Sequence, residues 1–245
     1  MNILLLDIET APNRAYVWGL FDQNISANQV EESSYVLCWS AKWLGAKKCN
    51  FMSVKTRSRK QVLKGIWGLL NEADAVVHFN GTKFDIPTLN KEFVKHHLAP
   101  PKPYKQIDLY RASKTAFRFE SHKLDYLCEA LGFGRKLKHE GFDLWVKCMA
   151  GNAEAWKVME QYNRRDVDLL EQLYIRLRPW IKQHPNVGLA NTGIVCPTCA
   201  SAQVRKEGTV VANLLRYQQY SCKSCFRWFR GNKALEKARE RGVNI

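Results

Sequence analysis

Residues 1–10, MNILLLDIET, open the chain with an apolar run that ends in two acidic residues. Such a run predicts a buried strand over residues 2–8 whose C-terminal end meets solvent. Two further apolar stretches, residues 36–44 and 48–54, flank a turn at Gly45 and predict two more strands. The first quarter of the chain therefore predicts the beginning of a β-sheet.

Strands and helices alternate through the next part of the chain. Apolar spacing predicts helices over residues 59–73, 84–98, 121–131 and a long helix from its cap Asn152 to residue 178, with strands over 75–80 and 106–110. Pro87 is compatible with the second helix because it falls in the first turn. This alternation favours an α/β fold in which helices flank a sheet.

The length of 245 residues favours one main domain with a small appendage. The helical pattern ends in HPNVGLANTG, residues 184–193, which we interpret as a linker. We therefore expect a main domain over residues 1–183 and a small module over residues 194–245.

The charge is strongly basic, with 38 Lys and Arg against 23 Asp and Glu. A formal net charge of +15 favours a polyanionic partner, nucleic acid before membrane. The apolar run at the N-terminus stops at Asp7, too short for a signal peptide or a spanning helix. We expect a soluble, cytoplasmic protein with no membrane partner.

The first candidate site residues are Asp7 and Glu9, separated by one apolar residue at the end of the first strand. Side chains at i and i+2 share one face of a strand, so both carboxylates can bind one cation. A solvated strand end is the alternative, because such triplets are common by chance.

Two later segments add further acids. Asp85 follows a strand in NGTKFD, residues 80–85, and lies where a helix begins, so it is equally well explained as a helix-capping acid. Tyr162 and Asp166 are four residues apart in the long helix and share one helical face, although a solvated polar pair has the same spacing.

In this order, the three segments resemble motifs I, II and III of the DEDD superfamily of 3′→5′ exonucleases. These enzymes have the RNase H-like fold and include DnaQ-type and family B polymerase proofreading domains. The NxxxFD form, Asn80 to Asp85, is similar to the family B type, and the YxxxD form, Tyr162 to Asp166, to the tyrosine (DEDDy) subgroup. Gln161 stands where the histidine subgroup has its histidine.

The resemblance covers roughly residues 1–182 and implies a role for each residue. Asp7, Glu9 and Asp166 would bind one Mg²⁺ or Mn²⁺, Asp7 would bridge to a second ion, and Asp85 would hold that second ion directly or through water. Tyr162 would orient the attacking water. Thr10, Asn80 and Phe84 would contact the terminal nucleotides, with core packing as the alternative for Phe84. Two such ions activate water and stabilise charge on phosphorus, and carboxylates suit hard cations.

Three other residues have structural explanations. We expect His78 to be a core histidine, Asp108 a structural acid, and Lys123 a solvated neighbour of the core residues Leu124, Leu127 and Leu131.

Four cysteines near the C-terminus form two CxxC pairs, Cys196 with Cys199 and Cys222 with Cys225. Four thiolates at this spacing indicate one structural Zn²⁺ in a zinc ribbon, with a redox pair as the alternative. We expect short strands at residues 202–206, 209–211 and 216–220 and a basic helix at 232–241. Basic and aromatic residues are interleaved here, which favours nucleic-acid binding over docking a protein or bracing the fold.

The sequence thus predicts a two-metal 3′→5′ exonuclease that releases nucleoside 5′-monophosphates, with DNA bearing a free 3′ end as the expected substrate and a replication or repair protein as a further partner. Two alternatives remain open. One is a non-catalytic nucleic-acid-binding protein with a zinc ribbon, and the other is a structure-specific endonuclease on the same fold.

Overall fold

The computed structural model describes residues 1–212 and 214–236. Its main sheet has five strands in the order β5-β4-β1-β6-β7, and β1 (Ile3–Thr10) lies at the centre. β4 (Val36–Trp43) runs antiparallel to β1, and β5 (Asn50–Ser53) antiparallel to β4. β6 (Ala75–His78) and β7 (Lys105–Asp108) are parallel to β1 and to each other. The sheet is therefore mixed.

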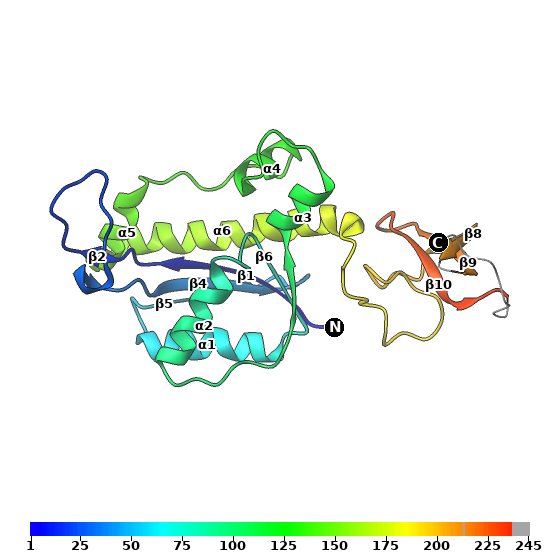
Figure 1. The fold of residues 1–245 in the computed structure, drawn as a ribbon, viewed down its shortest axis with the longest axis horizontal. Helices are drawn as coiled ribbons and strands as arrows, with labels where there is room; N and C mark the ends of the chain where they lie inside the picture. Colours follow the sequence, from blue (N-terminus) through cyan, green and yellow to red (C-terminus); the bar gives the residue numbers. More distant parts are fainter. Residues whose placement is uncertain (213, 237–245) are drawn as a thin grey trace. The chain divides into compact units, whose positions relative to one another are not determined.

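Helices cover both faces of this sheet (Figure 1). α1 (Arg59–Glu72) and α2 (Asp85–Lys95) lie on one face, and the long α6 (Ala153–Leu177) runs along the other. Leu4, Leu6 and Ile8 of β1 pack in one buried cluster with residues of α1 and α2. The expected α/β fold, with a mixed sheet between flanking helices, is confirmed.

The sequence patterns did not predict several smaller elements. They are β2 (Arg14–Ala15), β3 (Val30–Glu32), α3 (Leu109–Ala116) and α5 (Phe142–Met149). The strand expected at 106–110 ends at Asp108, because its carboxylate accepts hydrogen bonds from the N–H groups of Tyr110 and Arg111 and caps α3. The helix expected from residue 121 begins only at Leu124 (α4, Leu124–Ala130). Asn152 caps α6 as expected, since its side chain accepts from Ala155 N–H at 3.0 Å.

A second, smaller sheet lies near the C-terminus. It is antiparallel, in the order β10-β9-β8, with β8 at Val204–Ala212, β9 at Leu215–Cys222 and β10 at Trp228–Ala234. The two strands expected at 202–206 and 209–211 are one strand, β8, whose register shifts between Lys206 and Thr209, where Gly208 has a φ of 78°. The basic helix expected at 232–241 is wrong at its start, because residues up to Ala234 belong to β10, and residues 237–241 lie outside the described part.

The chain divides into two compact units, Met1–Ile175 and Arg176–Ile245. Residues 184–193 consist of turns and irregular backbone, and their role as a linker stays a prediction. Among the described residues, no helix is both long and apolar enough to cross a bilayer.

Candidate active site

Strand β1 carries Asp7 and Glu9 on the face of the sheet opposite its buried Leu4, Leu6 and Ile8. The alternation of side chains along a strand requires this placement, because Asp7 and Glu9 alternate with Leu6 and Ile8. Both acids are half-buried. The Trp145 side chain, from α5, hydrogen-bonds Glu9.

Helix α6 brings Tyr162 and Asp166 to the same place from residues more than 150 positions along the chain. Both side chains are buried, at 8% and 2% exposure. One carboxylate oxygen each of Asp7, Glu9 and Asp166 lies within 4.8 Å of the other two. We call these three residues the acidic cluster.

Asp85 joins this site from the N-terminus of α2. It is 4% exposed, and its Oδ1 accepts a hydrogen bond from the Ile8 N–H, between the two acids of β1, at 3.2 Å. The turn before α2 requires Gly81, because a Cβ there would lie 2.5 Å from the His78 ring and 2.9 Å from Asp85 Oδ2. The lack of a side chain at Gly81 therefore leaves room for the side chains of His78 and Asp85.

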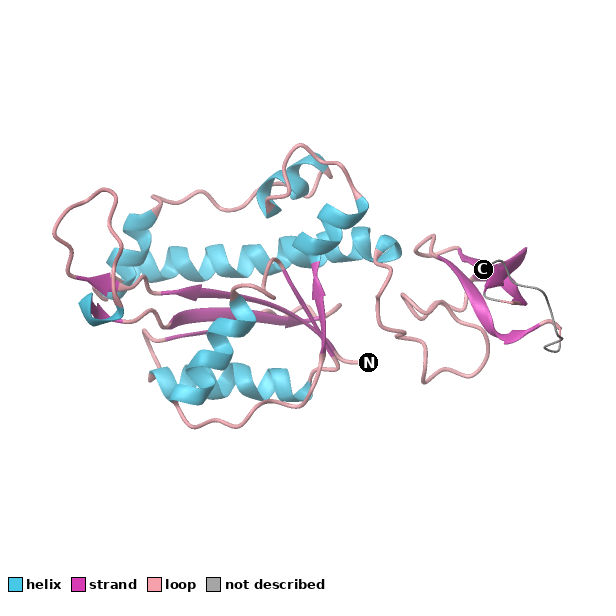
Figure 2. Cartoon of the chain, in the orientation of Figure 1, coloured by secondary structure: helices cyan, strands magenta, loops and turns pink. Residues whose placement is uncertain are grey.

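Lys136 contacts the acidic cluster through Asp166, and no sequence pattern predicted this contact. Its Nζ donates to Asp166 Oδ2 at 2.6 Å and to the Tyr162 hydroxyl at 3.1 Å. The lysine belongs to the extended connection between α4 and α5 (Figure 2). The only signal in the sequence is the basic segment GRKLKH, residues 134–139, which does not indicate which lysine turns inward.

Three more residues complete the site. Asn163 is fully buried, and its Nδ2 donates to Asp7 Oδ2 at 2.6 Å, which orients that carboxylate. The His139 ring packs edge-on against Tyr162 at 4.7 Å, and Trp145 contacts both rings. Asn163 stands inside the YxxxD motif, so its position was a usable signal. The other two come from the α4–α5 connection and α5, for which no pattern was visible.

The acids repel one another and resist ionisation. Burial, reinforced by Asp166 and Asp85, raises the pKa of Glu9 to about 8, although Lys136 opposes the shift. Burial raises the pKa of Asp85 to about 7 against the hydrogen bond from Ile8. Burial and the charges of Asp166, Glu9 and Asp85 also raise the pKa of Asp7 well above its usual range. One lysine therefore does not balance four carboxylates, and the site favours a cation.

The donors suit a hard divalent cation. Asp166 Oδ1 is buried and has no hydrogen-bond partner, so a strong acceptor is left free beside the oxygens of Asp7 and Glu9. An unpaired buried carboxylate oxygen is costly unless it binds a cation or water. Oxygen ligands of this kind match Mg²⁺ or Mn²⁺.

A cleft of about 770 Å³ opens beside Asp7. Asn80 and Lys136 line it, and so do Tyr110 and Lys114 from α3. Of the three residues expected to contact substrate, only Asn80 lines this cleft, and Thr10 and Phe84 do not. Core packing does not explain Phe84, because 47% of that residue is exposed.

The residues that the sequence predicted to be structural mostly have structural roles in the fold. His78 is fully buried, which confirms a core histidine. Asp108 accepts hydrogen bonds from four backbone N–H groups, which confirms a structural acid. Lys123 is exposed as expected, but it also lines the cleft. Leu131 is only half-buried, unlike Leu124 and Leu127.

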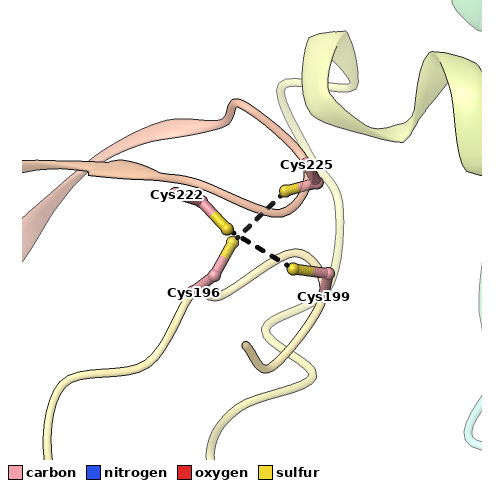
Figure 3. Close-up of side chains that lie close together, drawn as sticks. All are labelled: Cys196, Cys199, Cys222 and Cys225. Atoms are coloured by element: carbon pink, nitrogen blue, oxygen red, sulfur yellow. Dashed lines mark hydrogen bonds between the residues drawn. The ribbon is translucent and has the colours of Figure 1, made fainter. Parts of the chain in front are cut away.

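The four C-terminal cysteines point toward one another (Figure 3). Cys196 Sγ lies 3.5 Å from Cys225 Sγ, and Cys199 Sγ lies 3.6 Å from Cys222 Sγ. A tetrahedral Zn²⁺ with bonds of about 2.3 Å separates its sulfurs by about 3.8 Å, so this cluster is compatible with zinc. Burial opposes ionisation of Cys222, but hydrogen bonds with the backbone N–H groups of Cys225 and Ser224 and with the side chains of Cys199 and Cys196 together lower its pKa to about 7, which favours the thiolate.

Comparison with known protein families gives the class to which this fold and site belong. Residues 4–178 match the RNase H superfamily, so the chain belongs to that superfamily. Among solved structures, the chain is similar to the family B DNA polymerase from the hyperthermophilic archaeon Pyrobaculum calidifontis, with a TM-score of 0.56 and 16% identity. The match covers 73% of this chain and 24% of the polymerase, so it shows a shared fold over a minor part of that protein. A search of curated protein sequences gives no significant match.

Proposed function

We propose that the chain is a metal-dependent 3′→5′ exonuclease that hydrolyses nucleic acid, with DNA as the expected substrate, and releases nucleoside 5′-monophosphates. One observation carries the proposal: the carboxylates of Asp7, Glu9 and Asp166 converge within 4.8 Å beside Asp85 and Tyr162. Membership of the RNase H superfamily and the order of the three motifs support a nuclease of this kind.

Two divalent cations would occupy this site. Asp7, Glu9 and Asp166 would hold one ion, Asp7 would bridge to the second, and Asp85 would hold that ion directly or through water. When bound, the cations would lower the pKa of a water molecule and stabilise negative charge on the phosphate.

The protein side chains would position the reactants. The Tyr162 hydroxyl would orient the attacking water, and burial together with the charges of Asp166 and Glu9 raises its pKa, so it would act as a neutral hydroxyl. Asn163 would hold Asp7 in its binding orientation through the 2.6 Å hydrogen bond. Asn80 would contact the terminal nucleotide from the wall of the cleft.

The C-terminal unit would form a zinc ribbon. Cys196, Cys199, Cys222 and Cys225 would hold one structural Zn²⁺, and the apolar residues packed on them, Val204 and Phe229, are too few to form a core without metal. Metal analysis of the purified chain should find one zinc per molecule.

The test is a time course with single-stranded DNA, duplex DNA and RNA, each labelled at the 3′ or the 5′ end. With Mg²⁺ or Mn²⁺ we expect the 3′ label to be released at once as a mononucleotide. The strand that carries the 5′ label should become shorter by one nucleotide at a time. Without added divalent cation the substrates should persist. Omitting the cation is better than adding a chelator, because a chelator would also remove the zinc.

The matched variants are Asp166→Asn and Asp168→Asn, two residues apart on α6. Asp168 pairs with Lys42 away from the acidic cluster and its side chain is 45% exposed, so its variant should retain activity. Asp166→Asn should lose it. Full activity of Asp166→Asn would refute the proposed site. Internal cuts by the wild-type protein would indicate an endonuclease, and binding by the wild type without turnover would indicate a non-catalytic protein.

A further inference from the structure

The second cysteine knuckle of the C-terminal unit has a bulky residue where the backbone disfavours one. Phe226 follows Cys225 with a φ of 63°, and Ala200 follows Cys199 in the first knuckle with a φ of 60°. Their N–H groups make equivalent hydrogen bonds, Phe226 to the Cys222 carbonyl at 3.0 Å and Ala200 to the Cys196 carbonyl at 2.9 Å. The two knuckles thus have the same turn, and glycine would fit it best.

The phenylalanine ring gains no packing that offsets this strain. Phe226 is 77% exposed, so its ring contributes little to folding. A large side chain at positive φ is an outlier, and strained residues of this kind concentrate at functional sites. Folding therefore does not explain the ring, whereas contact with a ligand does.

The ring stands beside a second exposed aromatic residue on one face of the small sheet. Trp228 and Arg205 are both paired with Ser221, so these residues form one row across β10, β9 and β8. Trp228 is 55% exposed. Phe226, Trp228, Arg205 and Lys223 line a hollow of about 360 Å³.

The opposite face of the sheet is used for packing. Tyr220 and Phe229 form the next row and stack at 5.5 Å with an interplanar angle of 18°. Phe229 also packs against the cysteine cluster. Tyr220 is therefore buried and Phe229 partly buried, whereas Phe226 and Trp228 are exposed.

The charged residues that line the hollow are Arg205, Lys223 and Glu207, and the surrounding segment of the chain is also basic. Residues 194–236 contain seven Lys and Arg against two Glu. Lys223 is exposed and has no ion-pair partner within the described ranges. Glu207 also lines the hollow, but it pairs with Arg205 at 2.7 Å, and 16% of its side chain is exposed.

We propose that this face binds single-stranded nucleic acid, with bases stacked on Phe226 and Trp228 and the backbone phosphate held by Lys223 and Arg205. Unpaired bases expose the flat surfaces that aromatic rings need, and basic side chains neutralise the phosphates. The inference rests on the proposed function in one respect, namely that the ligand is nucleic acid. None of these four residues belongs to the acidic cluster, so the two proposals can be tested separately.

The experiment measures binding of the full chain to a short circular single-stranded DNA, without added divalent cation or chelator. A circle has no 3′ end, so exonuclease activity does not consume it. We expect Phe226→Ala and Trp228→Ala each to weaken binding about 5- to 150-fold, the range for loss of one stacked base. Lys223→Ala should reduce the slope of log affinity against log salt by about 1.

Matched variants separate this effect from damage to the zinc module. Val211→Ala removes an apolar side chain of β8 that is 64% exposed and lies outside the hollow, so it should bind as the wild type does. Phe226→Tyr keeps the ring and should retain affinity. Phe226→Gly removes both the ring and the strain, so it should retain zinc and still bind weakly.

If Phe226→Gly and Trp228→Ala retain zinc and bind the circle with the affinity of the wild type, the proposal is overturned, whatever the outcome of the nuclease assay. Loss of affinity that follows only loss of zinc would overturn it as well. Absence of nuclease activity together with weakened binding by these variants would refute the proposed function alone.

Discussion

Tyr162 contacts the acidic cluster through a single hydroxyl group. Tyr162→Phe removes that group and keeps the ring packed against His139 and Trp145. We expect the rate constant kcat for nucleotide release to fall about 100-fold, because the attacking water would lose the hydroxyl that orients it, with little change in substrate binding.

Steady-state kinetics of Tyr162→Phe and Tyr16→Phe would check this. Tyr16 is 69% exposed, donates its hydroxyl to Glu31 at 3.0 Å and does not line the cleft, so its variant should be unaffected. Equal kcat values in the two variants would exclude a role for Tyr162 in the reaction.

Lys136 is the one basic side chain that bonds directly to Asp166 in the described structure. Lys136→Met should lower the free energy of unfolding of the metal-free protein by about 1–3 kcal/mol, because a buried carboxylate loses its partner. Lys138→Met, at an exposed lysine two residues away, should have little effect. Urea unfolding of both variants at neutral pH measures the difference, and equal midpoints would contradict the prediction.

At the scale of elements, the turn between β6 and α2 sets the position of Asp85. Gly81→Ala would place a methyl group 2.5 Å from the His78 ring. The ring is fully buried, so the turn must shift and carry Asp85 with it. We expect a loss of about 1–3 kcal/mol of stability, typical of overpacking, together with reduced nuclease activity.

Gly68→Ala is the matched control for this substitution. Gly68 lies inside α1, and a Cβ there would meet no atom within 4 Å. Alanine is the better helix former by about 1 kcal/mol, so this variant should be slightly more stable. Thermal unfolding of the two variants should therefore give shifts of opposite sign, and the same sign in both would be evidence against the strained turn.

The connections between elements determine the rest of the site. The α4–α5 connection delivers Lys136 and His139, and α5 delivers Trp145. Residues 131–141 have no apolar periodicity, because they cross the surface above α6 instead of packing as a helix or strand (Figure 2). A contact made by such a segment depends on the path of the chain, so local patterns did not predict it.

At the scale of the whole molecule, the unbalanced acids make stability depend on pH. The pKa of Glu9 rises to about 8 and that of Asp85 to about 7 in the folded state, whereas both are near 4 in an unfolded chain. The folded protein therefore holds more protons between about pH 4 and pH 8, and its unfolding free energy falls as pH rises through that window.

Thermal unfolding of the metal-free protein at pH 6 and pH 8.5 would measure this effect. We expect a decrease in Tm on the order of 5 °C at the higher pH. Mg²⁺ should raise Tm and reduce the difference, because it binds the ionised folded form. Glu9→Gln should also reduce the difference in Tm between the two pH values. An unchanged difference in that variant would show that other groups cause the pH dependence.

The features that depend on local spacing were predictable from the amino-acid sequence. Alternation along β1 predicted that Asp7 and Glu9 share a face, helical spacing predicted the same for Tyr162 and Asp166, and two CxxC pairs predicted a cysteine cluster. The described structure contains each arrangement. The catalytic roles of these residues stay predictions.

Which other side chains surround the acids depends on contacts between distant segments of the chain. Lys136 and Asp166 are 30 residues apart, and Asn163 and Asp7 are 156 apart. The same holds for the hollow beside Trp228, which lies in a strand, β10, that local patterns did not predict. Spacing along the chain determines which side chains share a face of one strand or helix, whereas contacts between distant segments depend on how the layers pack.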